Sequence, residues 1–268
     1  TVLIARYLGE KRPERIGAVI GGAAIVFTMI SIGLFVVMVC FARPISVLMQ
    51  APEEAVALTA SYVRICGSGI FFIVAYNLLS AIFRGLGDSN SPLLFVLVAC
   101  IVNVIGDLVL VAGLHMDAAG AAIATVLSQF LSAAYVLLFL ERKAEMKARL
   151  LQKKELHSCV EYAKNIVSLG TAGFIMQLTN SLVTICCNHV LSATGGDIYI
   201  SVMTIVSSVR QMVETPIYAI NEGTSPILSY NYGAHRPALV RKAMVTMAMM
   251  ILVYTAVMWS VIIFAPDY

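Results

Sequence analysis

Charged residues are scarce in this sequence: Asp, Glu, Lys and Arg make up 12% of its 268 residues, and hydrophobic residues make up 60%. A soluble domain has roughly a quarter charged and about half apolar residues. The shortage of charge therefore excludes a chain that exposes most of its surface to water. Apolar stretches of about 20 residues recur instead, the length that a helix needs to cross a hydrocarbon layer about 30 Å thick. The sequence predicts an all-α polytopic membrane protein.

Motifs for disulfides, metals and catalysis are missing as well. The six cysteines form no C-x-x-C pair, so neither a disulfide framework nor a structural metal site is predicted. We find no metal-spaced histidine pair, no nucleophile beside a base, and no phosphate-binding glycine loop followed by Lys. We therefore expect a protein that is not an enzyme and that holds no cofactor.

Seven transmembrane helices are predicted, and none alternates with the period of two that a membrane barrel strand requires. They cover residues 16–40, 57–83, 93–114, 118–140, 165–191, 198–222 and 240–265. The basic residues indicate their orientation, because 15 of the 18 Lys and Arg residues fall before the first helix or in every second connection. By the positive-inside rule these segments are cytoplasmic. The net charge of +3 then reflects topology, and we infer no nucleic-acid partner from it.

An internal repeat extends this topology. Residues 1–13 can be laid on residues 225–237, where Gly, Arg and Pro recur at identical places, and Phe41-Ala42 likewise matches Phe264-Ala265. Six predicted spans separate the copies, so both copies have the same orientation, as in a parallel repeat of six-helix halves. We therefore expect a twelve-helix, two-lobe (6+6) transporter, of which this chain is the middle. The expected parts are an amino-terminal lobe over 1–145, a cytoplasmic linker over 146–164 and a carboxy-terminal lobe over 165–268.

One apolar run, from Leu93 to Leu114, contains a single ionisable side chain, that of Asp107. Asn103 lies four residues before it and shares its helix face. The short connection that follows makes the next helix an antiparallel neighbour, and counting from its ends pairs Asp107 with Thr125 and Asn103 with Gln129. Amide, hydroxyl and carboxylate oxygens together suit a proton or a hard cation such as Na⁺, and membrane carboxylates are costly unless they function. An interhelical hydrogen bond to a neutral Asp107 is the alternative interpretation.

Polar residues of the later spans are candidates for a substrate cavity, on weaker grounds than those for the site at Asp107. The candidates are Gln177, Asn180, Asn188, Arg210 and Glu214. Arg210 and Glu214 stand four apart, ahead of Pro216, so a self-neutralising ion pair beside a kink is an alternative to a role in the substrate path.

Several segments in this order resemble the multidrug and toxic compound extrusion (MATE) family, in its bacterial DinF-like branch. They are AIFRGLGDS at 81–89, Asn103-x-x-x-Asp107, AAGAAIAT at 118–125 and PILSYNYGA at 226–234. The resemblance implies a monomeric antiporter in the bacterial inner membrane that exports organic cations or drugs as H⁺ or Na⁺ enters. It also implies a cation site in the amino-terminal lobe, whose Asn, Asp and Thr would be Asn103, Asp107 and Thr125.

Two other functions remain open at this stage. A flippase for lipid-linked oligosaccharides or peptidoglycan precursors would line its cavity with several cationic side chains for the pyrophosphate, and only Arg64 and Arg210 lie where they could do so. A seven-helix receptor would need its amino terminus outside, whereas Arg6 to Arg15 place it in the cytoplasm.

Overall fold

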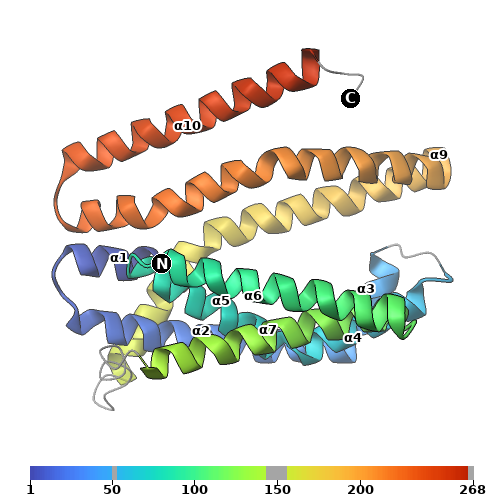
Figure 1. The fold of residues 1–268 in the computed structure, drawn as a ribbon, viewed down its shortest axis with the longest axis horizontal. Coiled ribbons are helices and arrows are strands. Elements are labelled where there is room, and N and C mark those ends of the chain that lie inside the picture. Colours follow the sequence, from blue (N-terminus) through green and yellow to red (C-terminus); the bar gives the residue numbers. More distant parts are fainter. Residues whose placement is uncertain (50–52, 143–155, 265–268) are drawn as a thin grey trace. The chain divides into compact units, whose positions relative to one another are not determined.

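The structure is a computed structural model that describes residues 1–49, 53–142 and 156–264, and these residues form helices joined by short connections (Figure 1). The helices are α1 (Val2–Gly9), α2 (Glu14–Cys40), α3 (Ala42–Leu48), α4 (Val56–Ser68), α5 (Ile70–Gly85), α6 (Asn90–Asp107), the π-helix η1 (Leu108–Gly113), α7 (Asp117–Arg142), α9 (Leu156–Gly233) and α10 (Pro237–Phe264). The prediction of an all-α protein is confirmed for this part of the chain. The predicted linker over 146–164 lies mostly outside the described residues.

Among the described residues, five helical segments are long and apolar enough to cross a membrane: Glu14–Cys40, Asn90–Gly113, Asp117–Val136, Cys159–Leu191 and Pro237–Phe264. The pair α4 and α5 adds a sixth span if the two helices are taken together. The chain is therefore a multi-pass membrane protein. The sixth predicted span, over 198–222, is helical but is not among these segments, so the count of seven stays a prediction.

The span predicted over 57–83 is not one straight helix. Its two parts, α4 and α5, meet at Gly69 with a bend of 54°. A Cβ atom on Gly69 would lie only 3.0 Å from the Cβ atom of Val126 on α7. Glycine at this position therefore lets the bend pack against α7. This contact is tertiary, so the length of the apolar run does not predict the bend.

Helix α9 includes both the fifth and the sixth predicted spans, and it carries Pro216 and Pro226 inside it. A straight helix of its 78 residues would be about 117 Å long, roughly four times the thickness of the hydrocarbon layer. A single crossing by α9 is therefore excluded by its length.

The chain divides into two compact units. The larger unit comprises residues 14–84 and 88–185, and the smaller unit comprises residues 1–13, 85–87 and 186–268. The lobe boundaries expected from the sequence are a separate matter and stay a prediction.

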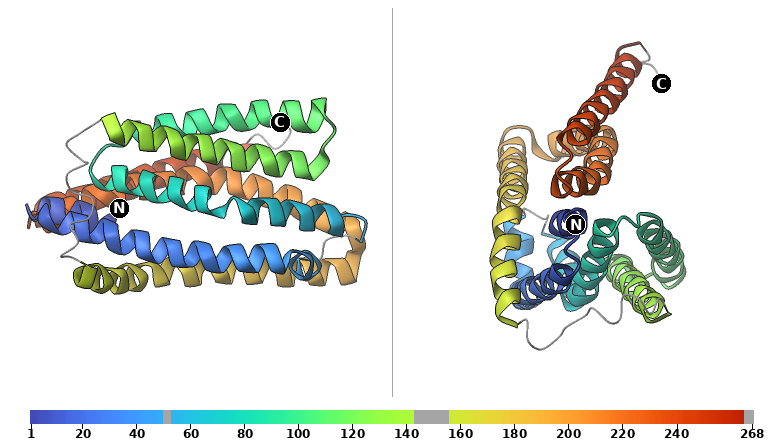
Figure 2. Two further views of the ribbon diagram at one scale, coloured as in Figure 1. Left: turned by 90° about the horizontal axis from the view of Figure 1, so that it is seen from below. Right: turned by 90° about the vertical axis from the view of Figure 1, so that its left-hand side faces the viewer.

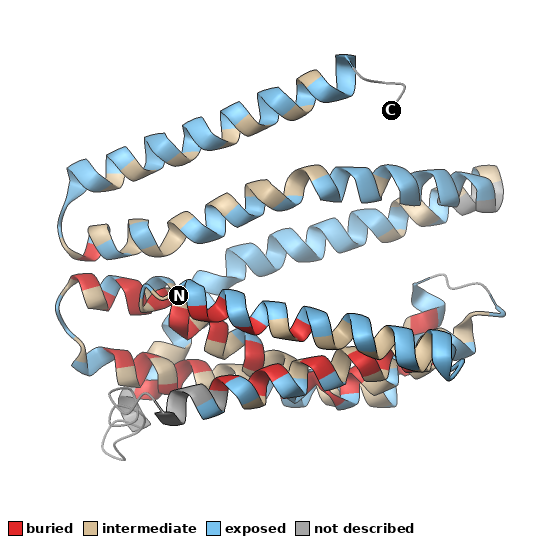
Figure 3. Ribbon diagram, in the orientation of Figure 1, coloured by how far each residue is buried: buried red, intermediate tan, exposed pale blue. Residues whose placement is uncertain are grey.

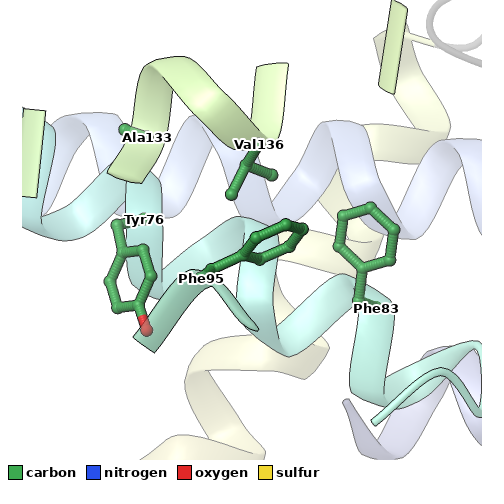
Figure 4. Close-up of a cluster of buried hydrophobic side chains, with 5 residues drawn as sticks. All are labelled: Tyr76, Phe83, Phe95, Ala133 and Val136. Atoms are coloured by element: carbon green, nitrogen blue, oxygen red, sulfur yellow. The ribbon is translucent and has the colours of Figure 1, made fainter. Parts of the chain in front are cut away.

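The core of the larger unit lies where α5, α6 and α7 meet. Tyr76, Phe83, Phe95, Ala133 and Val136 are buried there together (Figure 4), and the rings of Phe83 and Phe95 pack edge to face with centroids 5.5 Å apart. The Ser132 hydroxyl of α7 donates to the Phe95 carbonyl oxygen of α6 at 3.0 Å. Helices α6 and α7 run side by side (Figure 2). The core packs the start of α6 against the later part of α7 and so fixes how the two helices align.

The start of α6 is set by Asp88. Helix α6 begins at Asn90, and the Asp88 carboxylate accepts hydrogen bonds from the Ser91 N–H at 3.0 Å and the Ser91 hydroxyl at 2.6 Å. An acidic side chain at a helix start satisfies a free N–H group and suits the helix dipole.

In the smaller unit, two helix ends have the same backbone structure. Each helix closes with three backbone hydrogen bonds and one residue in the left-handed region, Lys11 (φ 56°) after α1 and His235 (φ 53°) after α9. The bonds are Glu10 N to Arg6 O, Lys11 N to Leu8 O and Arg12 N to Tyr7 O, matched by Ala234 N to Tyr230 O, His235 N to Tyr232 O and Arg236 N to Asn231 O. Every pair of positions differs by the 224 residues found in the sequence. The two turns are thus alike in structure as well as in sequence.

Candidate functional site

The close approach of two helices builds the site in the larger unit. Gly106 faces Ala124, because a Cβ atom on Gly106 would lie 2.8 Å from the Ala124 Cβ atom. Gly120 faces Leu110, with 3.2 Å between its would-be Cβ atom and that of Leu110. Glycine in membrane helices allows backbones to come this near, and polar side chains can then meet between them.

Asn103 and Thr125 meet across this interface. The Asn103 amide donates from Nδ2 to the Thr125 Oγ1 at 3.4 Å, and the Thr125 hydroxyl donates to the Ala121 carbonyl oxygen at 2.9 Å. Both side chains are half-buried. Because the Thr125 proton is used within its own helix, its oxygen faces α6 as an acceptor.

Asp107 and Gln129 lie on either side of this pair. The glycine contacts place Thr125 level with Ile105, between Asn103 and Asp107, so the pairs that we counted from the helix ends are off by about two residues. A π-helix explains the direction of this difference: η1 follows Asp107, and its wider turns rise less per residue than an α-helix. Asp107 is therefore nearer the end of the helix than α-helical counting predicts.

Two oxygen atoms of the site are buried without a hydrogen-bond partner among the described residues. They are Oδ1 of Asp107 and Oε1 of Gln129. A buried acceptor without a partner costs free energy, and native structures rarely tolerate one unless water, a proton or an ion satisfies it. An oxygen set of this kind fits a proton or a hard monovalent cation. No transition-metal centre is indicated, since no group of three His, Cys, Asp or Glu side chains gathers anywhere in the described part of the chain.

Comparison with known proteins identifies the family. The family model MatE matches residues 1–109 and 173–268, which is most of the chain. The chain belongs to the MATE family. The resemblance seen in the sequence motifs is thereby confirmed.

Relatives within the MATE family include multidrug exporters. The chain is 22% identical over 262 residues to the multidrug export protein MepA of Staphylococcus haemolyticus, covering 97% of this chain and 57% of that protein. It is 28% identical over 137 residues to the probable multidrug resistance protein YpnP of Bacillus subtilis, covering 51% and 31%. The chain thus spans between about a third and three fifths of the length of these relatives.

Solved MATE structures share the fold. An outward-facing multidrug resistance MATE family transporter of the MOP superfamily superposes with a TM-score of 0.86 at 24% identity, over 99% of this chain and 59% of that one. A MOP superfamily transporter from Pyrococcus furiosus gives a TM-score of 0.88 at 24% identity over the same shares. At this identity the likeness establishes the fold alone.

Sequence reasoning missed one residue at the site of this MATE chain, Tyr62. Helix α4 packs against α7, and the Tyr62 phenol interacts with the side chains of Thr125 and Cys66 and lies within reach of the Asp107 charge. A tyrosine in an apolar helix carries no signal of such a role, because aromatic residues are common there. Cys66 lies four residues on, on the same helix face as Tyr62, so the contact between the two follows from helical spacing once the role of Tyr62 is known.

The cavity residues predicted in the later spans are divided between the two units. Gln177 and Asn180 are exposed on the part of α9 in the larger unit, and Asn188 is half-buried in the smaller unit. Arg210 and Glu214 face each other with 3.9 Å between Nε and Oε1, and their side chains are 67% and 41% exposed. The ion pair expected from their spacing is present, and the substrate cavity stays a prediction.

Proposed function

We propose that the intact protein is a secondary antiporter that exports organic cations or drugs in exchange for inward H⁺ or Na⁺. The observation that carries this proposal is the buried, unpartnered Oδ1 of Asp107 beside the Asn103–Thr125 pair, inside two membrane helices. A carboxylate in that setting is costly unless it exchanges protons or ions. Membership of the MATE family and the multidrug exporters among the relatives support the substrate class.

The proposal includes a 6+6 architecture with basic connections in the cytoplasm of a bacterial cell. The two matched turns of the smaller unit and the two segments matched by the family model support the repeat. The distribution of Lys and Arg supports the orientation.

Coupling at Asp107 predicts reciprocal binding. If protonation or Na⁺ occupancy of Asp107 favours one conformation, the affinity for drug must depend on pH or Na⁺ by the same factor as the affinity for the ion depends on drug. A drug affinity that is constant across pH and Na⁺ concentration, with transport intact, would contradict this coupling.

The test uses everted membrane vesicles that contain the intact protein. An established pH gradient is monitored while fluorescent organic cations are added, with and without Na⁺. Wild-type protein should dissipate the gradient, and Asp107→Asn, which has the same shape but cannot ionise, should reduce the exchange to the level of empty vesicles.

Asp117→Asn is the matched control. Asp117 is exposed at the turn before α7 with φ 47°, a conformation that Asn accepts, so this change removes an equal charge outside the site. Exchange should persist in the control. Undiminished exchange in Asp107→Asn would reject Asp107 as the coupling residue, and a wild type without exchange would favour a lipid flippase assay as the next step.

A further inference from the structure

The two matched helix ends of the smaller unit are in direct backbone contact. Gly9, the last residue of α1, lies against the Tyr230 carbonyl oxygen, and Gly233, the last residue of α9, lies against the Arg6 carbonyl oxygen. A Cβ atom on either glycine would collide with that oxygen. It would also lie 3.0 Å from Ala234 N in the first case and 3.0 Å from Arg6 C in the second. Any side chain at either position forces the helices apart.

This contact is reciprocal in the sense that symmetry requires. Gly233 corresponds to Gly9, and Tyr230 corresponds to Arg6, at the same separation of 224 residues. Gly9 of the first turn contacts Tyr230 of the second, and Gly233 of the second turn contacts Arg6 of the first, so the two contacts are made by equivalent pairs of residues. Contacts in which residue i meets j and j meets i arise at a two-fold axis. A local pseudo-two-fold axis thus passes through this crossing, which we call the glycine crossing.

Packing in the smaller unit concentrates at the glycine crossing. Among the described residues from Cys186 to Phe264, Gly233 alone is buried, and the residues of α10 are half-buried or exposed throughout (Figure 3). In α1, by contrast, Ile4, Ala5 and Gly9 are buried. In the described part of this unit from Cys186 on, burial is therefore confined to the crossing.

Side chains reinforce the crossing weakly. The Arg6 guanidinium lies 5.6 Å from the centre of the Tyr232 ring and also pairs with Glu10, with 2.9 Å between Nε and Oε1. The Glu10 hydrogen bond raises the pKa of Arg6, so the cation persists at all physiological pH. An exposed cation–π contact contributes on the order of 0.5–1 kcal/mol. The contacts described at the crossing are backbone against backbone and one weak side-chain pair, so opening it does not require either helix to unfold.

We propose that the glycine crossing is the cytoplasmic gate of the transporter: it is closed in this structure and separates when the cavity opens to the cytoplasm. This inference rests on the proposed function and on the orientation that places both turns in the cytoplasm. In a transporter built from two repeats, access alternates as one repeat rocks against the other. The glycine crossing lies on the repeat axis and is formed by one turn from each repeat. When one repeat rocks against the other, this contact must separate and form again.

The first test measures the gate without measuring transport. Spin labels are attached at Arg12→Cys and Arg236→Cys, equivalent exposed positions just beyond the two turns, in intact protein whose other reactive cysteines are replaced. The distance distribution should contain a short and a long population, and pH, Na⁺ or an organic cation should shift their ratio. A single distance under every condition would overturn the gate, because the crossing would then be a permanent joint.

Glycine substitutions supply the matched comparison. Gly9→Ala and Gly233→Ala should each move the ratio toward the long population by about tenfold, since overpacking penalises only the closed state. Gly223→Ala, on the same helix as Gly233 but with nothing within 4 Å of its added methyl group, should leave the ratio unchanged. Equal ratios in all three variants and the wild type would overturn the proposal.

A cross-link keeps the proposal testable if the alanine variants fail to fold. Joining Arg12→Cys to Arg236→Cys with a short reducible reagent should abolish exchange in vesicles, and reduction should restore it. Full exchange in the cross-linked protein would contradict the gate. The two proposals can fail separately: a protein that switches between two distances but never exchanges cations retains the gate and loses the antiport function.

Discussion

At Asp107 the carboxylate has one buried oxygen for which the described protein supplies no donor. Asn103 would be the nearest amide by sequence, but its Nδ2 donates to Thr125 instead. The arrangement leaves the buried acceptors of Asp107 and Gln129 for a ligand that is positively charged or carries a proton. Polar contacts between membrane helices contribute little stability on average, so stability alone is a weak reason for a carboxylate at this interface.

Thr125→Val tests the hydroxyl of this set. Valine has the same shape but removes the acceptor facing Asn103, so the apparent affinity for the coupling ion should fall about fivefold, equivalent to about 1 kcal/mol. The measurement is the Na⁺ or proton concentration that gives half-maximal exchange in vesicles. Thr125→Ser keeps the hydroxyl and should behave as the wild type. If Val and Ser gave equal affinities, Thr125 would have a packing role only.

The site residues differ in how far the sequence reveals them. Asp107 stands out because an ionisable group in an apolar run is rare, and Asn103 follows from helical spacing. Thr125 and Gln129 required a count across a turn, and in the structure the register differs by about two residues, in the direction that the π-helix η1 explains. Tyr62 depends on how α4 packs on α7, and that is a tertiary fact with no local signal.

Helices show the same division between local and tertiary causes. The spans near α2, α6, α7 and α10 could be predicted because the length of an apolar run is a property of the sequence itself. The bend between α4 and α5 could not, since it depends on Gly69 meeting Val126 of another helix.

Tyr254→Phe tests how α10 supports α9. The Tyr254 hydroxyl donates to the Val213 carbonyl oxygen at 3.1 Å, which ties α10 to α9 one turn ahead of Pro216. Loss of this bond should lower the free energy of unfolding by about 0.6 kcal/mol, and the thermal midpoint in detergent by about 2 °C. Tyr218→Phe is the control, because the Tyr218 hydroxyl has no hydrogen-bond partner among the described residues. Equal midpoints for the two variants would mean that the bond does not stabilise the protein.

For the whole molecule, the number of membrane spans depends on whether residues 198–222 cross the bilayer. This segment carries Arg210 and Glu214, each of which costs about 2.5–3.5 kcal/mol at the centre of a bilayer. Their pairing within one helix reduces that cost, since two opposite charges enter as one neutral unit. The low hydropathy of the segment is therefore compatible with a span that lines a polar interior and does not face lipid.

Reporter fusions after Met116 and after Arg236 decide this count. Three predicted spans separate the two positions, so alkaline phosphatase should be active after Met116, outside, and a green fluorescent protein should fluoresce after Arg236, in the cytoplasm. If residues 198–222 do not cross, only two spans intervene and both positions report the same side. Opposite sides in the reversed sense would keep seven spans but overturn the positive-inside assignment, and with it the cytoplasmic location of the glycine crossing. Replacing Arg210 and Glu214 together by Leu should leave the pattern unchanged if the segment already crosses, because a more apolar segment has no further crossing to make.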